Sequence, residues 1–449
     1  MSDILFHYYR VNPTTWFYLA SLLSIALFFK FNRVLSMRNV DLIGLILLAP
    51  GLLAVEYGGY KASTAAQQLG FVWIFAVTGL FLVRMLFDSI MVRRPMLEPN
   101  LSVGGLTFLG ISLLVFLLAN VITTRPQRDD LAAAATATKL EAGEGHVDAD
   151  QLARLGPGYP LLFLLPQIST QRIFTPEVAA AGPDTTASSR RAVHETTARI
   201  MAILSQLAIV SGMVLIGWWH FDNVRLGIAA AVLYLLLPYT AIMTGRVDHV
   251  LPGALITWAV VAYRRPFTAG CLIGLAIGTI YYPVFLLPLW CGFYWERGIR
   301  RFALGVVAAL LVLVVALWFT SPNGGVFLDQ LRQMFGWIFP NDVSLEGFWA
   351  LPGNDAVFRL PVLAAFIAMM ATLAIWPSPK NLGTLMSCTA SVLLGSQFWK
   401  AHDGGLFMAW FLPMLLLVIF RPNLENRVAL LVLDADWFPR RRPPIDRAA

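Results

Sequence analysis

Long apolar blocks alternate with short polar connections along most of this chain. A transmembrane helix needs about 20 mostly apolar residues to cross roughly 30 Å of hydrocarbon. Breaks at charges, prolines and glycine clusters therefore predict an all-α integral membrane protein with about 13 transmembrane helices. The predicted spans are 12–29, 41–57, 69–87, 101–122, 199–219, 226–243, 249–263, 267–280, 283–295, 302–320, 357–376, 381–397 and 404–420.

One boundary depends on the sequence Tyr281-Tyr282-Pro283, which separates the spans 267–280 and 283–295. The alternative is a single kinked helix, which would reverse the direction of every later span. The first span is expected to remain as an anchor. The residues before it lack the basic segment, short apolar core and small-residue cleavage site of a signal peptide.

Lysine and arginine are distributed unevenly between the two sets of alternate loops. One set, with the C-terminal tail, holds eighteen of them, whereas the other set, without its one long loop, holds five. Basic residues in short loops stay on the cytoplasmic side. The N-terminus is therefore expected outside a cell inner (plasma) membrane and the C-terminus in the cytoplasm. The ratio also favours two spans over 267–295, and it places the long segments 123–198 and 321–356 outside.

The composition narrows the class of protein further. The 449 residues are 58% hydrophobic and 13% charged, whereas soluble domains carry about 25% charged residues. The net charge of +7 comes from basic residues beside the spans, so lipid head groups are the expected partner rather than nucleic acid. The three cysteines lie inside spans without metal-ligand spacing and predict no disulfide framework.

Polar residues divide the chain into three parts. Residues 1–100 form an N-terminal extension of three spans, 101–420 form the main transmembrane body, and 421–449 form a basic cytoplasmic tail. The extension has few polar residues and is expected to be separable from the body. The charged side chains of Glu56 and Arg84 lie near its span ends, where they can reach the interface.

The outer segment 123–198 is expected to carry interfacial helices. The alanine-rich run Leu131–Ala142 has high helix propensity and weak hydrophobicity, which suits a helix lying at the membrane surface. Gly158-Tyr159-Pro160 leads into the apolar stretch 161–165, which is too short to span and is expected to dip into the bilayer or lie along its surface. Residues 176–196 are rich in Ala, Ser, Thr and Pro and predict a loop.

The order of these features resembles a known family. A span, an acidic boundary residue, a surface helix and Gly-Tyr-Pro precede LLLPYTAIMTGRVDH and RRPFTAGCLIGLAIGTIYYP. Over 101–320 the chain is similar to the GT-C superfamily of polytopic glycosyltransferases. The resemblance implies sugar transfer from a polyprenyl-phosphate carrier on the extracytoplasmic face. It also implies a catalytic or metal-binding acidic residue in the first outer loop. The pair Asp129-Asp130 departs from the family's Asp-Glu followed by Tyr, and the first three spans are additional.

Sugar transfer requires a base for the acceptor hydroxyl and a cation for the departing phosphate. Asp129, and after it Asp130, are the candidate catalytic residues, acting directly or through a divalent cation such as Mg²⁺ or Mn²⁺. Their side chains point about 100° apart on a helix, so they are not expected to bind one ion together. The structural alternative is a solvated first turn of a helix, where the helix dipole favours carboxylates.

Two further outer clusters are candidate phosphate-binding sites. Arg246, Asp248 and His249 lie in a tight turn, where the arginine suits a carrier phosphate and Asp248 suits a metal or the acceptor. Lys400 and His402 follow the span 381–397 and offer a second cation. The alternatives are a capped turn and ordinary interfacial residues.

Tyr281 and Tyr282 are typical of an aromatic belt at the outer interface, and stacking on a sugar is the second interpretation. Two other functional classes stay open: a polytopic transporter or flippase, and a catalytically inactive GT-C-like protein. The spans between 199 and 420 have no charged residue near their centres, which favours the enzyme over the transporter. Convergence of Asp129, Arg246 and Asp248 on one outward cavity would favour the enzyme over the inactive protein.

Overall fold

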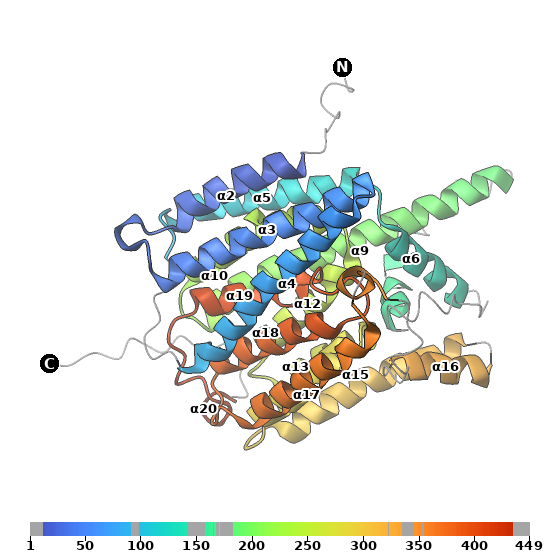
Figure 1. Ribbon diagram of the computed structural model, residues 1–449. Coiled ribbons are helices and arrows are strands. Elements are labelled where there is room, and N and C mark those ends of the chain that lie inside the picture. The colour runs from blue at the N-terminus through green and yellow to red at the C-terminus, as the bar shows by residue number, and fades with distance from the viewer. Residues whose placement is uncertain are drawn as a thin grey trace.

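The computed structural model describes residues 12–90, 98–141, 158–164, 166–167, 170, 183–321, 323–334, 345–351 and 354–433. These residues form helices and connecting turns, with one isolated β-bridge between Asn381 and Val428. The helices pack side by side in a bundle (Figure 1). The predicted all-α class is confirmed.

The helices follow the apolar blocks. They are α2 (Pro13–Phe28), α3 (Met37–Lys61), α4 (Thr64–Phe87), α5 (Val103–Thr123), α6 (Arg128–Glu141), α9 (Pro183–Trp219), α10 (Val224–Leu236), α11 (Pro238–Met243), α12 (Val247–Val261), α13 (Pro266–Thr279), η3 (Tyr282–Leu286), α14 (Leu287–Phe293), α15 (Ile299–Thr320), α16 (Gly324–Met334), α17 (Arg359–Ile375), α18 (Leu382–Trp399), η7 (Met408–Trp410), α19 (Leu412–Phe420) and α20 (Ala429–Val432).

Five helices in the described part of the chain are long and apolar enough to cross a membrane: α3, α4, α5, α9 from Arg190, and α15. Several others are apolar but shorter. Outward faces carry large apolar side chains, such as Phe108 on α5 and Phe319 on α15, which are 75% and 81% exposed. Exposed apolar surface of this extent suits contact with lipid. The chain therefore has the build of a membrane-embedded protein.

The segment 267–295 forms two helical pieces that fold back on each other. α13 ends before Ile280, whose backbone is extended, and the chain resumes as η3 and α14. The Tyr294 hydroxyl donates to the Tyr263 carbonyl at 2.6 Å, so the two ends of this segment meet. The prediction of two segments agrees with the structure, and a single kinked helix does not.

Loops gather at two opposite ends of the bundle. At one end, Arg225 donates to the carbonyls of Pro99 and Leu101, and Arg427 pairs with Asp222. At the other end the first outer segment meets the turn before α12, and Glu346 N–H donates to the Ala401 carbonyl. α6 and α16 lie at this second end (Figure 1).

Buried contacts join the N-terminal extension to the body. Arg84 on α4 holds Asp41 of α3 at 3.0 Å and Asp88 at 3.2 Å, and Asp88 pairs with Arg421 at 2.7 Å. Asp88 and Arg421 are 1% and 3% exposed. A side chain at Gly383 would clash with the Arg421 guanidinium, so α18 leaves room for it. The extension is thus fastened to α18 and α19 through charges that would be costly to separate.

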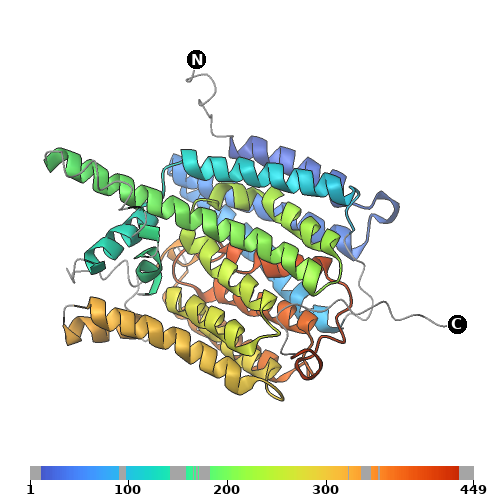
Figure 2. The same cartoon turned by 180° about the vertical axis from the view of Figure 1, so that it is seen from behind.

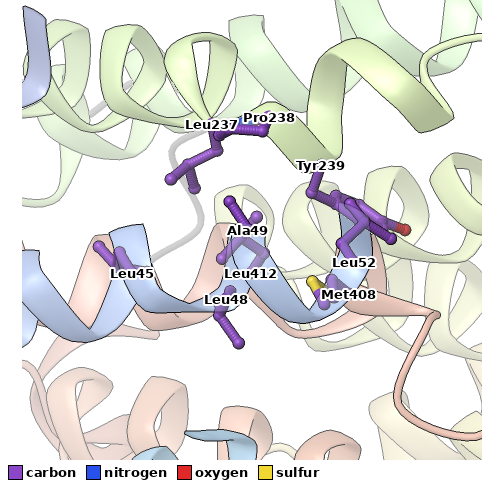
Figure 3. A pocket seen from close by; sticks show the side chains of 9 residues that line it. All are labelled: Leu45, Leu48, Ala49, Leu52, Leu237, Pro238, Tyr239, Met408 and Leu412. Carbon is purple, nitrogen blue, oxygen red and sulfur yellow. The ribbon is translucent and has the colours of Figure 1, made fainter. Parts of the chain in front are cut away.

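A small apolar pocket lies where the extension meets the body. α3 lines it with Leu45, Ala49 and Leu52, and the opposite wall includes Leu237 and Tyr239 (Figure 3). The wall bends there because Pro238 begins α11 after the end of α10. Proline lacks an N–H and cannot continue a helix without a break. The predicted single span 226–243 is therefore divided into α10 and α11, and Tyr239 follows directly after the division.

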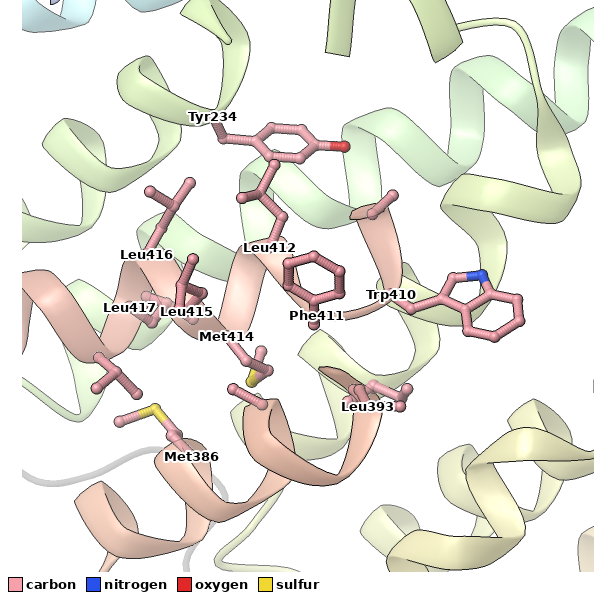
Figure 4. Close-up of a cluster of buried hydrophobic side chains, with 14 of the residues drawn as sticks. Tyr234, Met386, Leu393, Trp410, Phe411, Leu412, Met414, Leu415, Leu416 and Leu417 are labelled. Atoms are coloured by element: carbon pink, nitrogen blue, oxygen red, sulfur yellow. The ribbon is translucent and has the colours of Figure 1, made fainter. Parts of the chain in front are cut away.

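The centre of the bundle is α19. Every residue of this helix is buried, as expected for a helix that is apolar all round. Figure 4 shows Leu412, Met414 and their neighbours packed between Tyr234 of α10 and Met386 and Leu393 of α18. The loop before α19 is held against the end of α18, where the Gly405 N–H donates to Gln397 Oε1 at 3.2 Å.

Two predictions for the outer segment need correction. Residues from Pro183 onward begin α9 instead of forming a loop, and α9 projects beyond the bundle beside α6 (Figure 2). Residues 158–164 are helical, and Tyr159 and Phe163 are fully buried, so this stretch packs inside the protein and not along the bilayer. The stretch is buried because side chains of α6 and α9 pack against Tyr159 and Phe163. Predicted features at 1–11, 91–97, 142–157, 176–182 and 434–449 lie outside the described residues.

Candidate functional site

Asp130 is a buried acidic residue in the segment 123–198. It lies in the first turn of α6 and is 1% exposed. Its Oδ1 accepts the Tyr159 hydroxyl at 2.8 Å, and its Oδ2 accepts the Val247 N–H at 3.4 Å. The carboxyl group therefore connects α6 to the 158–164 helix and to the start of α12.

Asp129, the first choice from sequence, does not share this environment. It is half-buried, whereas Asp130 lies on the face of α6 that also buries Ala133, Ala134 and Ala137. Neighbouring helical residues point about 100° apart, so the register that buries Asp130 turns Asp129 away. The geometry favours Asp130 as the candidate catalytic group.

Tyr159 was not identified as a site residue from sequence. The chain can bring it to Asp130 because Gly158 lies directly against the backbone of Gly278, where a side chain would clash. The tyrosine is fully buried. The Gly-Tyr-Pro motif was the available signal, and it marks a close helix contact rather than a surface turn.

Arg246 and Asp248 form a bidentate ion pair in the turn before and at the start of α12. Arg246 Nη2 and Nε lie 2.8 and 3.2 Å from the two carboxylate oxygens. The Asp248 carbonyl accepts the Trp410 Nε1–H at 3.1 Å, which ties this turn to η7. Asp248 is 3% exposed. The turn is thus a packed junction and not a solvated cap.

His249 lies behind this pair and is fully buried. Its ring stacks on Phe407 with centroids 4.3 Å apart. Its Nδ1 is 2.7 Å from the Tyr239 hydroxyl, and its Nε2 is 3.7 Å from Asp248 Oδ2. The histidine therefore bridges α11, α12 and the loop before α19.

Lys400 lies in a box of aromatic rings. Its Nζ is 3.7 Å from the Phe407 centroid and 4.6 Å from those of Tyr282 and Trp410, and the residue is 3% exposed. Rings attract a cation through their negative faces. Tyr282 is therefore part of a buried cation site, whereas the aromatic-belt interpretation required an interfacial side chain. Tyr281 is half-buried and packs on Tyr282 and Phe285.

His402 lies at the edge of the same region. Its Nδ1 is 3.6 Å from Glu346 Oε2, and the Glu346 N–H donates to the Ala401 carbonyl at 2.8 Å. The third predicted cluster thus reaches the segment 345–351, and its lysine is turned inward while its histidine stays half-buried.

The charged groups of the site lie close enough together to shift one another's pKa values. Burial and the negative charge of Asp248 raise the pKa of Asp130 to about 8. Burial lowers the pKa of Lys400 to about 7, and the carboxylates of Asp248 and Asp403 oppose that shift. Burial disfavours the charge of Arg246, but the attraction of Asp248 outweighs it and raises the arginine pKa. Arg246 therefore stays positively charged, whereas Asp130 and Lys400 gain or lose a proton near neutral pH.

A divalent cation, which the sequence left open as one route for the chemistry, finds no matching ligand set among the described residues. No group of three or more His, Cys, Asp and Glu side chains gathers there. Both carboxylate oxygens of Asp248 are taken by Arg246, and Asp129 lies on another face of α6. Magnesium and manganese require several oxygen ligands, so these residues do not fit either ion.

Comparisons of this chain with protein-family models, with curated proteins and with solved structures found no match.

Proposed function

We propose that this protein is a membrane glycosyltransferase that moves a sugar from a polyprenyl-phosphate carrier to an acceptor on the extracytoplasmic face. One observation supports this function above the others. Three polar clusters, more than a hundred residues apart in sequence, share one end of an apolar helical bundle: Asp130, the Arg246–Asp248 pair and Lys400. The charges of each cluster shift the pKa of a group in another cluster.

The arrangement suits the chemistry of transfer to a hydroxyl. The acceptor oxygen forms a new bond to the anomeric carbon of the sugar, while the bond from that carbon to the phosphate oxygen breaks. The bonding electron pair leaves with the phosphate, whose added charge Arg246 and Lys400 would stabilise. The acceptor proton passes to the carboxylate of Asp130. A phosphate beside Lys400 would raise its pKa again and keep it cationic.

The position of the site suits an amphiphilic donor. The polyprenyl chain can stay among the apolar helices while its phosphate and sugar reach the polar end. We propose thirteen crossings of the inner membrane, a GT-C-like arrangement, an outside N-terminus and a cytoplasmic C-terminus. The two-ended sorting of loops and the basic residues at the end opposite the site support this topology.

A transporter is less well supported. Transporters place ionisable groups near the middle of the membrane, on broken helices. The charged residues of this site lie instead at the ends of their helices, in the first turn of α6, before α12 and after α18. An inactive GT-C-like protein would keep the same helices, and only a reaction distinguishes it.

The test is release of the leaving group. Purified full-length protein in liposomes would receive lipid-linked sugars extracted from its own cell type, and free polyprenyl phosphate would be measured by chromatography. We expect release that depends on the protein and falls about 10²–10³-fold in Arg246→Ala. No release by the unaltered protein with any lipid-linked sugar would support the inactive class.

A further inference from the structure

The loop between α14 and α15 ends in two exposed arginines, Arg300 and Arg301, which lie in the first turn of α15. Arg297 of the same loop donates to the Leu430 carbonyl at 3.2 Å, so the loop lies beside α20. α20 and α6 lie at opposite ends of the bundle (Figure 1). This basic patch is therefore remote from the candidate site.

An exposed apolar stripe continues directly from these arginines along α15. Leu304 follows Arg300 by four residues and Arg301 by three, so it is their neighbour on the helix surface. Leu304, Val307 and Leu311 are 62%, 58% and 60% exposed. One face of α15 is thus basic at its start and apolar over the next three turns.

The start of α13 and the loop before α15 extend this surface. A side chain at Gly305 would clash with the Phe267 carbonyl oxygen, so the two helices touch there, and Phe267 is 50% exposed. Trp295, five residues before Arg300, is 71% exposed. Tryptophan gathers where lipid head groups meet hydrocarbon. The loop is therefore expected at the depth of the head groups.

The length of the stripe matches one leaflet of a bilayer. Eleven residues separate Arg300 from Leu311, which corresponds to a rise of about 16 Å along the helix. One leaflet contributes about 15 Å of hydrocarbon. A lipid whose phosphate meets the arginines can therefore lay an acyl chain along the stripe. Guanidinium groups suit the phosphate because they donate two parallel hydrogen bonds to its oxygens.

We propose that this surface, formed by Phe267, Trp295, Arg300, Arg301 and Leu304, binds an anionic phospholipid of the membrane that holds the protein. Water would solvate the arginines but leave the apolar side chains uncovered. A zwitterionic lipid would cover the apolar side chains but bring its own positive charge towards the arginines. An anionic phospholipid meets both requirements, since basic residues at a membrane surface attract negative head groups. The inference does not depend on sugar transfer.

The test is native mass spectrometry of the full-length protein in detergent, titrated with dioleoylphosphatidylglycerol or with dioleoylphosphatidylcholine of the same chain length. We expect the unaltered protein to retain phosphatidylglycerol more strongly. Arg300→Gln combined with Arg301→Gln should weaken that binding about 10- to 30-fold. Arg190→Gln combined with Arg191→Gln is the matched control, because it removes two adjacent exposed arginines from α9. The control should bind as the unaltered protein does.

Glycerol 3-phosphate presents the same phosphate without acyl chains. At the concentration of the lipid it should not displace phosphatidylglycerol, because the apolar stripe would stay uncovered. Equal retention of the two lipids, unchanged binding in the Arg300 and Arg301 double variant, an equal loss in the control, or displacement by glycerol 3-phosphate would each overturn the inference. None of these measurements involves a sugar, so the proposed function can fail while lipid binding holds, and the reverse.

Discussion

At the scale of single residues, a helix register decides which of two adjacent carboxyl groups enters the site. Asp129 and Asp130 are indistinguishable by residue type, and the alanines that follow give no amphipathic pattern from which to choose. The choice depends on where α6 begins and on Tyr159, which arrives from a separate helix. Sequence located the three clusters but could not supply this contact, because it depends on tertiary packing.

Asp130→Asn should change the pH dependence of stability. In the unfolded chain an aspartic acid titrates near 4, whereas burial and Asp248 raise the pKa of folded Asp130 to about 8. Between these values the folded state binds the extra proton, so Asp130 lowers stability progressively as pH rises. Asparagine can still accept from Tyr159 but does not titrate. Thermal unfolding in detergent from pH 6 to 9 should show a smaller loss of stability in Asp130→Asn; parallel curves for the two proteins would contradict the raised pKa.

At the scale of elements, the all-helical class and the presence of membrane-length apolar helices were predictable, because the length of an apolar block can be read directly from the sequence. The predicted break at Tyr281-Tyr282-Pro283 agrees with the structure, and so does the predicted alanine-rich helix from Leu131, as far as the described residues extend. The division at Pro238 and the helical residues after Pro183 were missed. Pro238 is equally compatible with a single kinked span, so the sequence around it does not show that a new helix begins there. After Pro183 a polar stretch continues directly into an apolar helix, and its polar composition gave no sign of the helix.

The Asp88–Arg421 contact should make the N-terminal extension indispensable for stability. Arg421→Met would remove one partner of a buried pair and is expected to cost about 3–5 kcal/mol. Arg427→Met is the control, because its partner Asp222 is 76% exposed and such pairs contribute about 0–1 kcal/mol. Thermal unfolding of both variants measures the difference. Equal shifts would show that the contact does not hold the extension, and a truncated chain starting at Pro95 should then remain dispersed in detergent.

At the scale of the whole molecule, the arrangement of the two ends gives the topology a direct check. Asp329 on α16 and Glu296 before α15 are both exposed, and the candidate span α15 lies between them along the chain. Asp329→Cys should react with an impermeant maleimide in intact cells, and Glu296→Cys only after the membrane is opened. The protein with its native cysteines gives the background. Labelling with the reverse pattern would invert the proposed orientation and put the site on the cytoplasmic face.

The central claim is that a site built around Asp130 transfers a sugar from a phosphate-linked lipid. Its most direct test is the rate of sugar transfer by Asp130→Asn compared with Asp129→Asn, in membranes that hold equal amounts of folded protein. Loss of the base should lower the rate by about 10²–10⁴-fold in Asp130→Asn, whereas Asp129→Asn should stay within a few fold of the unaltered protein. Full activity in Asp130→Asn, or equal losses in both variants, would contradict the account.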